Sequence, residues 1–413
     1  MKITSIQALE ILDSRGKPTV RTFVRLEDES VHSSSVPSGA STGSHEAVEL
    51  RDSDEKRFLG QGVQKAVNNV NTFLNDALKG MSVSDPDAID KKMLEIDGTE
   101  NKSNLGANAI LSVSQAVVRA AAYTHKVPLW DFINQYYFKD TAPAFPRLMV
   151  NVVNGGKHAG WNFDIQEFMV VPNATQPSES VQIAAEIFAQ LGKNLKKKGL
   201  STLVGDEGGY SPLLSSNKEV LDAIHDAARA LDYSTGVHYD LALDAAASEF
   251  YNDGVYEFKK TNKKLTGEEL LQYYLELRHD DGIISFEDPF AEDDWKTFTA
   301  FTEQAHNDFL VVGDDLFVTN PKRIKKGIEE LAANAVLIKL NQIGSVHETV
   351  QAIKMARKAG WKFIISHRSG ETEDSFIADF AYGSGANFIK TGSMSRSERL
   401  AKYNRLIEIE NKL

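Results

Sequence analysis

The sequence predicts an α/β protein in which a smaller α+β N-terminal domain, over residues 1–140, precedes a TIM-type (β/α)8-like barrel over residues 141–413. Two observations predict the barrel. In the C-terminal part, short apolar runs recur first after 43 residues and then at intervals of 23 to 28 residues, which a strand, a helix and two short loops would fill. Each run ends in a charged or polar residue, and barrels of this kind carry their chemistry at the C-terminal ends of strands.

The start of the chain predicts a three-stranded antiparallel meander. Apolar and polar residues partly alternate, as in half-buried strands, over residues 3–12, 18–27 and 31–36. The segment DSRG at residues 13–16 has the composition of a turn between the first two strands. These strands form the β part of the predicted N-terminal domain.

Helices are predicted to follow this meander. Between residues 61 and 79 apolar residues recur at spacings of three and four, which indicates one buried helical face. Residues 85–96 and 104–124 have a helical pattern as well. Between residues 123 and 151 the pattern gives way to a Tyr- and Phe-rich stretch with Pro143 and Pro146, and we place the domain boundary there.

Six apolar runs predict strands of the barrel. They are YDLALD, GIISFED, FLVVGDD, AVLIK, FIISHR and ANFIK, which end at Asp244, Glu287–Asp288, Asp314–Asp315, Lys339, His367–Arg368 and Lys390. Runs that are apolar almost throughout are typical of a parallel sheet buried on both faces. Helices are predicted between the runs, for example over residues 320–332 and 346–359, each after a capping signal.

Composition excludes several classes of function. The 46 Lys and Arg residues against 58 Asp and Glu residues give a net charge of −12, which repels nucleic-acid phosphates, so we expect no primary nucleic-acid partner. The absence of cysteine excludes disulfides and thiolate metal sites and suits the reducing cytoplasm, where we expect the protein. Polar residues interrupt the small apolar residues of 107–123, so we expect no membrane insertion.

The acidic strand ends predict a metal site. Because the strands of a closed barrel end at one mouth, Asp244, Glu287 and Asp314 are expected to converge. Three close carboxylates repel one another unless a cation lies between them, and oxygen ligands with room for water suit Mg²⁺. The alternative is that each aspartate only caps the helix that follows its strand.

The basic strand ends predict an anionic substrate. Arg368 can bind a phosphate with two donors, and Lys390 can act as a point charge on a carboxylate or phosphate. Lys339 is the candidate base, because neighbouring cations lower the pKa of a lysine. The alternative for Lys339 is a salt bridge with the facing carboxylates.

Polar segments upstream of the six apolar runs, most of them with glycine residues, are further candidates. They are SGASTG at residues 38–43, NGGKH at 154–158, QE at 166–167 and GDEGG at 205–209. Glycine allows close approach to a ligand and hinge motion. A flexible surface loop remains an alternative for the first segment, and a strained turn for the last.

In these segments and strand ends the chain resembles the enolase family. The resembling stretches run almost end to end: DSRGKPTV, SVPSGASTG, HEAVELRD, DGTENKSNLGANAILSVS, NVVNGGKHAG, DIQEFM, GDEGGYSP, LALDAAASEFY, SFEDPFAEDDW, GDDLFVTNPKR, IKLNQIGS, SHRSGETEDSFIAD and IKTGSMSRSERLAKYN. The resemblance implies the reversible dehydration of 2-phospho-D-glycerate to phosphoenolpyruvate through an enediolate.

The resemblance also implies roles for individual residues. Asp244, Glu287 and Asp314 match ligands of a first Mg²⁺, and Ser41, in the mobile loop 37–43, matches a ligand of a second Mg²⁺ that binds with substrate. Lys339 matches the base and Glu207 the acid, which Glu167 supports. The other residues match substrate contacts: Arg368 and Ser369 at the phosphate, Lys390 at the carboxylate, and His158, Gln166 and His367 around the substrate, with His367 also in the catalytic group.

Partners follow from the same resemblance. It implies 2-phosphoglycerate or phosphoenolpyruvate as the small-molecule partner and a homodimer or larger homo-oligomer. A non-catalytic surface-binding or scaffold protein is the rival class, and a decayed site would identify it. Every expected catalytic position is filled in this chain, which favours the enzyme.

Overall fold

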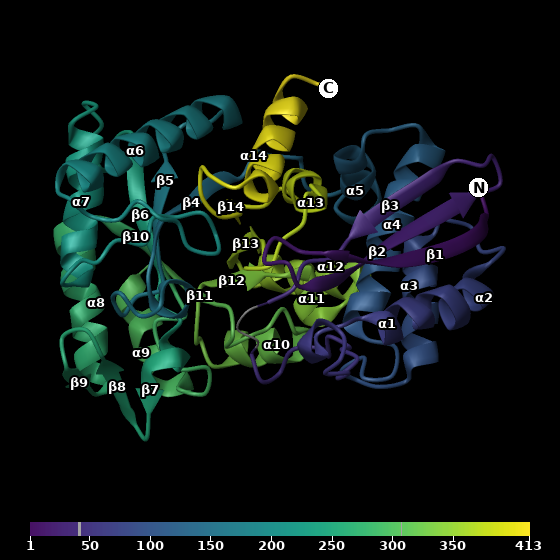
Figure 1. Cartoon of the computed structure of the whole chain (residues 1–413), viewed down its shortest axis with the longest axis horizontal. Helices are drawn as coiled ribbons and strands as arrows, with labels where there is room; N and C mark the ends of the chain where they lie inside the picture. Colours follow the sequence, from purple (N-terminus) through teal and green to yellow (C-terminus); the bar gives the residue numbers. More distant parts are fainter. Residues whose placement is uncertain (40–42, 307) are drawn as a thin grey trace.

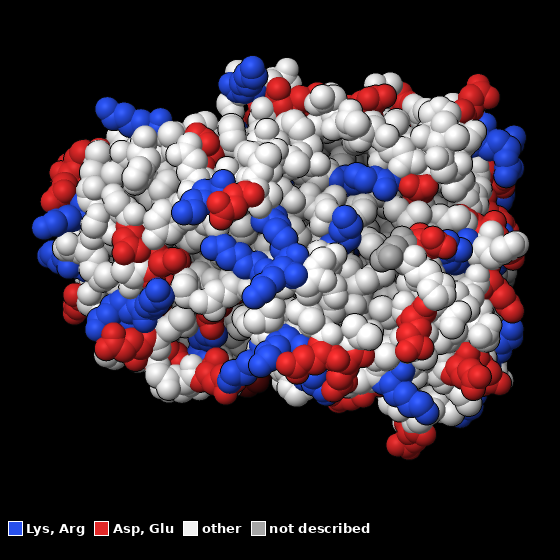
Figure 2. All heavy atoms as spheres, turned by 180° about the vertical axis from the view of Figure 1, so that it is seen from behind, with Lys and Arg blue, Asp and Glu red and all other residues white. Residues whose placement is uncertain are grey.

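The computed structural model describes residues 1–39, 43–306 and 308–413. Figure 1 shows the N-terminal sheet with its helices on one side of the molecule and the barrel on the other, so the predicted fold class is confirmed. In the described part of the chain, no helix is both long enough and apolar enough to cross a membrane. On the face that Figure 2 shows, Asp and Glu side chains lie among Lys and Arg side chains.

The predicted meander is confirmed. It consists of β1 (Ile3–Leu12), β2 (Pro18–Leu26) and β3 (Val31–Ser35), paired antiparallel in that order. Val20 and Val24 of β2 are fully buried, and β2 and β3 pack on helix α4 (Ala107–His125). Almost every residue of α4 up to Ala122 is buried. The small apolar stretch is therefore a core helix.

The other N-terminal helices match the predictions with two differences. They are α1 (Gln64–Asn69), the π-helical turn η2 (Val70–Leu74), α2 (Asn75–Leu78), α3 (Pro86–Asp97) and α5 (Leu129–Tyr137), preceded by the short η1 (Phe58–Gly60). The predicted helix over 61–79 thus contains a π-helical turn, and near it Asn71 and Asn75 accept the backbone N–H groups of Ala8 and Ile6. Helix α5 lies in the stretch where no pattern was recognised.

The barrel is closed and has eight strands. In spatial order they are β10 (Ile283–Glu287), β11 (Leu310–Gly313), β12 (Ala335–Ile338), β13 (Lys362–Ser366), β14 (Phe388–Lys390), β4 (Arg147–Asn154), β5 (Glu167–Pro172) and β6 (Tyr239–Asp244). The six predicted strands are confirmed and pair in parallel. The sequence did not identify β4 and β5, and the expectation of a parallel sheet is wrong for β5, which is antiparallel to both neighbours.

The antiparallel strand has a simple cause. Only the short 3-10 turn η3 (Gly156–Ala159) lies between β4 and β5, so this connection lacks the crossover helix that a parallel pair needs. As a result β5 begins at the mouth where the parallel strands end. Glu167, its first residue, pairs in register with Asn154 at the end of β4 and with Asp244 at the end of β6.

Helices and one small sheet complete the barrel. The helices are α6 (Pro177–Lys197), α7 (Asn217–Arg229), α8 (Gly267–Asp281), α9 (Trp295–Ala305), α10 (Pro321–Glu329), α11 (Leu340–Ile343), α12 (Val346–Lys358), α13 (Phe376–Ser384) and α14 (Ser397–Glu410), with the short η4 (Ala247–Phe250). The sheet consists of β7 (Tyr251–Asn252), β8 (Val255–Phe258) and β9 (Lys263–Leu265). Apolar side chains from seven barrel strands form a core cluster of their own, so the barrel has a packed interior.

Candidate active site

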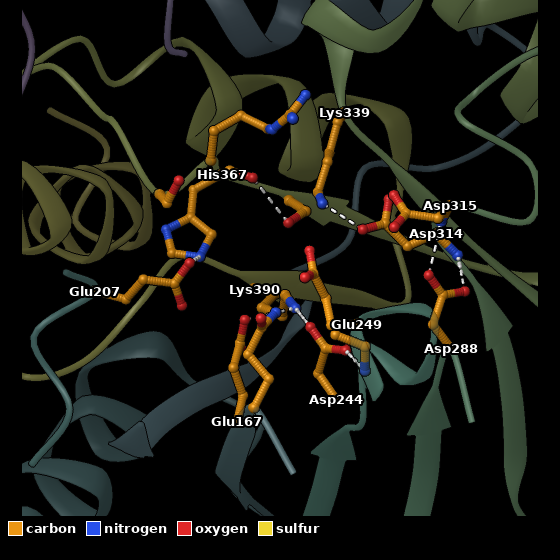
Figure 3. Close-up of a pocket in the computed structure, with 15 residues that line it drawn as sticks. Glu167, Glu207, Asp244, Glu249, Asp288, Asp314, Asp315, Lys339, His367 and Lys390 are labelled. Carbon is orange, nitrogen blue, oxygen red and sulfur yellow. Dashed lines mark hydrogen bonds and ion pairs between the residues drawn. The ribbon is translucent and has the colours of Figure 1, made fainter. Parts of the chain in front are cut away.

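A polar pocket lies at the mouth of the barrel (Figure 3). Its lining comes from strand ends and the loops that follow them, and it includes Gln166, Glu167, Glu207, Asp244, Glu249, Asp288, Asp314, Asp315, Lys339, His367, Arg368, Ser369 and Lys390. Most of the residues singled out in the sequence therefore share one pocket. Glu287 adjoins it through an ion pair with Lys390.

Lys390 lies among three buried carboxylates. Its Nζ donates to Glu167 Oε1 at 3.2 Å, to Asp244 Oδ2 at 3.0 Å and to Glu287 Oε1 at 2.9 Å. Burial lowers the pKa of Lys390, but the three carboxylates outweigh it and raise the pKa well above its usual value. A lysine of the chain thus supplies one positive charge among the acidic strand ends.

Two of these carboxyl groups have raised pKa values despite the positive charge of Lys390. The pKa of Glu167 is raised by burial and by the nearby Glu207, and the pKa of Glu287 by burial and by Asp244. Glu167 Oε2 is buried and has no hydrogen-bond partner within the described residues. The cluster therefore carries more negative charge than its own lysine balances.

Lys339 forms an ion pair with Asp314. Asp314 also accepts a hydrogen bond from Gln342 Nε2 at 2.8 Å. Burial and the charges of Arg368 and Lys390 lower the pKa of Lys339, but Asp314 outweighs them and the pKa is raised. The sequence led us to expect that neighbouring cations lower the pKa of Lys339, whereas in this arrangement the nearest charge, the Asp314 carboxylate, raises it.

A second acidic group follows β10 and β11. Asp288, Asp314 and Asp315 place ligand oxygens within 4.8 Å of one another, which suits a metal ion. Asp288 accepts the backbone N–H groups of Asp314 at 2.8 Å and Asp315 at 2.7 Å, so it fixes the end of β11. Burial and the neighbouring Asp314 raise the pKa of Asp315 to about 8. Of the three ligands expected from the sequence, only Asp314 belongs to this group.

Glu207 and His367 face each other across the pocket wall (Figure 3). His367 Nε2 lies 3.6 Å from Glu207 Oε1, and Asn151 donates to Glu207 Oε2 at 3.0 Å. The loop of Glu207 needs its glycine, because Gly208 has a φ of +88° and a side chain there would meet Ser395 O at 2.7 Å. Burial lowers the pKa of His367 to about 3.

Arg368 is bound by a carboxylate from the N-terminal domain. Its guanidinium donates to both oxygens of Glu46, at 2.9 and 3.2 Å, and to Asn341 Oδ1 at 3.0 Å. Burial lowers its pKa, but Glu46 outweighs burial and the pKa is raised. The expected phosphate contact therefore has an internal anion as its partner here.

Two residues singled out in the sequence cannot be placed. Ser41 lies outside the described residues, and so does the side chain of His158, although the backbone of His158 belongs to η3. Gln166 is buried at the pocket, and its backbone N–H donates to Asp244 O at 3.0 Å.

Family models match both parts of the chain. The model of the enolase N-terminal domain matches residues 3–133, and the model of the enolase C-terminal TIM barrel domain matches residues 143–413. The chain belongs to the enolase family. Enolase family membership makes it a lyase, a phosphopyruvate hydratase, with an enolase-type activity toward 2-phosphoglycerate.

The enolase site contains residues that the sequence analysis did not single out. Asp288 and Asp315 follow Glu287 and Asp314 directly, so the doubled acidic residues at two strand ends were a usable signal. Glu46, which binds Arg368, comes from an N-terminal loop, and Arg399, whose Nη1 lies 2.7 Å from His367 Nδ1, comes from α14. Both lie away from the strand ends in the sequence. No periodicity in the sequence indicates that either residue reaches the mouth of the barrel.

Proposed function

We propose that the chain interconverts 2-phospho-D-glycerate and phosphoenolpyruvate plus water in a Mg²⁺-dependent reaction, with Lys339 as the base and Glu207 as the acid. The observation that supports this most directly is the placement of the two groups. Figure 3 shows Lys339 and the Glu207–His367 pair reaching into one pocket from different sides. A substrate between them would offer its C2 proton to one and its C3 hydroxyl to the other.

Buried cationic side chains would stabilise the negative charge that develops on the substrate. Removal of the C2 proton puts further negative charge on a substrate that already carries a carboxylate and a phosphate. Lys390, which is 2% exposed, would stabilise the carboxylate, and Arg368 and Ser369 would bind the phosphate. The Glu46–Arg368 pair would have to open or shift for that contact to form.

Protonation of Glu207 would be favoured by its surroundings. Its side chain is buried, and Glu167 lies close enough for the two carboxylates to repel. Two neighbouring buried carboxylates tend to share one proton. We propose that this proton is the one that leaves with the C3 hydroxyl as water, and that Glu167 supports the acid in this way.

The residues present fit a divalent cation. The site has an excess of buried carboxylates, and Glu167 Oε2 is unpartnered within the described residues. We propose Asp244, Glu287 and Asp314 as ligands of the first Mg²⁺, with Asp288 and Asp315 in reach of Asp314, and Ser41 as a ligand of the second. When bound, Mg²⁺ would supply positive charge opposite the developing enediolate.

The remaining expectations stay proposals. They comprise a glycolytic role, a cytoplasmic location, a homodimer or larger homo-oligomer, and closure of loop 37–43 over substrate. The domain boundary near residue 140 is also proposed. The acidic net charge of −12 supports the absence of a primary nucleic-acid partner.

Isotope exchange separates the two proposed roles. Lys339→Ala should abolish both phosphoenolpyruvate formation and exchange of the C2 hydrogen with deuterated solvent, because the base is gone. Glu207→Gln should lose phosphoenolpyruvate formation but keep measurable C2 exchange, which NMR of 2-phosphoglycerate in deuterium oxide detects. Lys91→Ala, on the exposed face of α3, serves as a matched control and should behave as the wild type.

Two outcomes would contradict the proposal. Wild-type protein that forms no phosphoenolpyruvate in Mg²⁺ would refute the activity itself. Exchange that survives Lys339→Ala and disappears in Glu207→Gln would reverse the two roles. Mg²⁺ should raise the temperature of thermal unfolding. At a free Mg²⁺ concentration one hundred times the dissociation constant, the gain in unfolding free energy should be about 2.7 kcal/mol, and Asp314→Asn should reduce this gain.

A further inference from the structure

Arg399 of α14 is a fully buried arginine at the junction of two active-site loops. Its Nη1 donates to His367 Nδ1 at 2.7 Å and to Arg368 O at 2.6 Å. Its Nη2 donates to Ser369 O at 2.6 Å and to Asp206 O at 3.1 Å. One guanidinium thus binds the segment of the proposed phosphate contacts, the loop of the proposed acid, and the histidine between them.

We propose that Arg399 is a positioning residue that holds His367 as the neutral tautomer with its proton on Nε2, directed at Glu207. A guanidinium has five N–H donors, no acceptor, and keeps its proton in proteins. His367 Nδ1 must therefore accept from Arg399 with its lone pair. A neutral imidazole with a bare Nδ1 carries its proton on Nε2.

The doubly protonated ring is also disfavoured. A proton on Nδ1 would face the N–H groups of Arg399. Among the charged groups near the ring in the described part of the chain, Glu207 raises the pKa of His367, whereas Arg399 and Lys390 lower it. Burial acts most strongly and in the same direction as the two cations, so His367 stays neutral.

This tautomer has a consequence for the acid. Nε2 lies 3.6 Å from Glu207 Oε1 and presents an N–H to it, never a lone pair. His367 therefore directs an N–H group toward the Glu207 carboxyl group and cannot take the proton that Glu207 carries as the proposed acid. With the other tautomer, the imidazole would compete with the substrate hydroxyl for that proton. The catalytic consequence rests on the proposed function, whereas the tautomer itself does not.

A purely structural role is the alternative, and Arg396 separates the two. Arg396 lies on the same segment and donates through Nε to Gly205 O at 3.1 Å, on the same loop as Glu207. Arg396 thus donates a hydrogen bond to the backbone of this loop, whereas Arg399 also donates to the imidazole of His367. Arg396→Met is therefore a matched control that loosens the loop without removing the donor to His367.

The first test uses the wild-type protein. Long-range ¹H–¹⁵N correlation NMR of histidine-labelled protein distinguishes the two tautomers and the imidazolium, and the signal absent from His367→Gln assigns the ring among the 10 histidines. We expect the Nε2–H pattern, unchanged between pH 5.5 and 8.5. The Nδ1–H pattern, or an imidazolium anywhere in this range, would overturn the proposal.

The second test uses variants. Arg399→Met should give a mixture of tautomers and lower kcat for 2-phosphoglycerate by about 10- to 100-fold, the scale found for residues that orient metal-binding histidines. Arg399→Lys keeps one donor and should restore the Nε2–H pattern and part of kcat, and Arg396→Met should keep that pattern. An unchanged pattern in folded Arg399→Met would overturn the proposal. If Arg399→Met does not fold, the wild-type spectrum and the spectrum of Arg399→Lys test the proposal. A wild-type protein without turnover would refute the proposed function but would leave the tautomer assignment unchanged.

Discussion

The mouth of the barrel and the contact between α3 and α12 both bury carboxylates, but they balance them differently. At the mouth, Lys390 binds three carboxylates and Lys339 binds Asp314. At the contact, Asp90 of α3 is 1% exposed, and Oδ2 accepts from Ser114 Oγ at 2.8 Å and from the backbone N–H of His347 at 2.9 Å. Its Oδ1 has no hydrogen-bond partner among the described residues.

The difference shows what Lys339 does for the charge of Asp314. Without a lysine of its own, Asp90 has a pKa that burial raises to about 7, so it carries its charge only in part at neutral pH. Asp314 is buried too, but Lys339 outweighs burial and lowers its pKa. The mouth thus keeps Asp314 charged, as the proposed role of a metal ligand requires, while Asp90 serves the packing of the two domains.

The largest expected effect comes from removing the cation of the mouth. Lys390→Met would leave Glu167, Asp244 and Glu287 buried without their lysine, and breaking such a group costs about 3 to 5 kcal/mol of stability. The loss should be larger at pH 8 than at pH 5, because protonation relieves unpaired carboxylates at the lower pH. Urea unfolding in chelator at the two pH values measures both effects.

A buried lysine outside the mouth provides the control. Lys102 is 2% exposed and pairs with Glu348 of α12 at 2.7 Å. Lys102→Met leaves one partly exposed carboxylate in place of three buried ones, so its cost should be smaller and nearly independent of pH. Equal losses in Lys390→Met and Lys102→Met would contradict the idea that charge excess distinguishes the mouth.

The strand ends of the mouth were predictable from the sequence, and their surroundings were not. Regular spacing of apolar runs predicts that residues such as Asp244, Lys339 and Lys390 end strands of one barrel, and topology then brings them together. Glu167 begins an antiparallel strand, so that spacing did not find it. It was found instead in the polar segment at residues 166–167 and through family resemblance. Glu46 and Arg399 reach the mouth through packing between domains and helices, which no local pattern records.

The same limit applies to parts of the fold. The strands β4 and β5 are buried, but a hairpin connects them, so they lie outside the regular series of strands and helices. Asp90 could not be recognised either. It is one of several acidic residues on α3, and only the docking of α12 shows that it is buried.

A smaller effect is expected from Asp90→Asn. The folded-state pKa of Asp90, about 7, lies above its unfolded value, so stability is fully present below pH 4 and is lost as the pH rises toward 7. Asparagine can accept the same hydrogen bonds and does not ionise. Between pH 4 and pH 8 the variant should gain between about 3 and about 4 kcal/mol relative to the wild type, at about 1.36 kcal/mol for each pKa unit. Parallel pH profiles of the unfolding free energy would contradict the assignment of a buried, raised carboxyl.

The smallest expected effect tests whether the contact between α3 and α12 contains an ion pair that contributes to stability. His347 Nδ1 lies 2.8 Å from Asp87 Oδ1, and this hydrogen bond outweighs burial and raises the pKa of His347. A histidine with a raised folded-state pKa adds stability that is fully present below its unfolded pKa and is lost as the pH rises through the folded value. His347→Gln should therefore cost about 1 kcal/mol or less at pH 5.5, because Asp87 is partly exposed, and almost nothing at pH 9. Urea unfolding of this variant and of Asp87→Asn, alone and combined, measures the coupling. The same cost at both pH values would show that packing, and not the protonated ring, connects His347 to α3. The contact would then have no charge pair at this position, and it would differ even more from the mouth of the barrel.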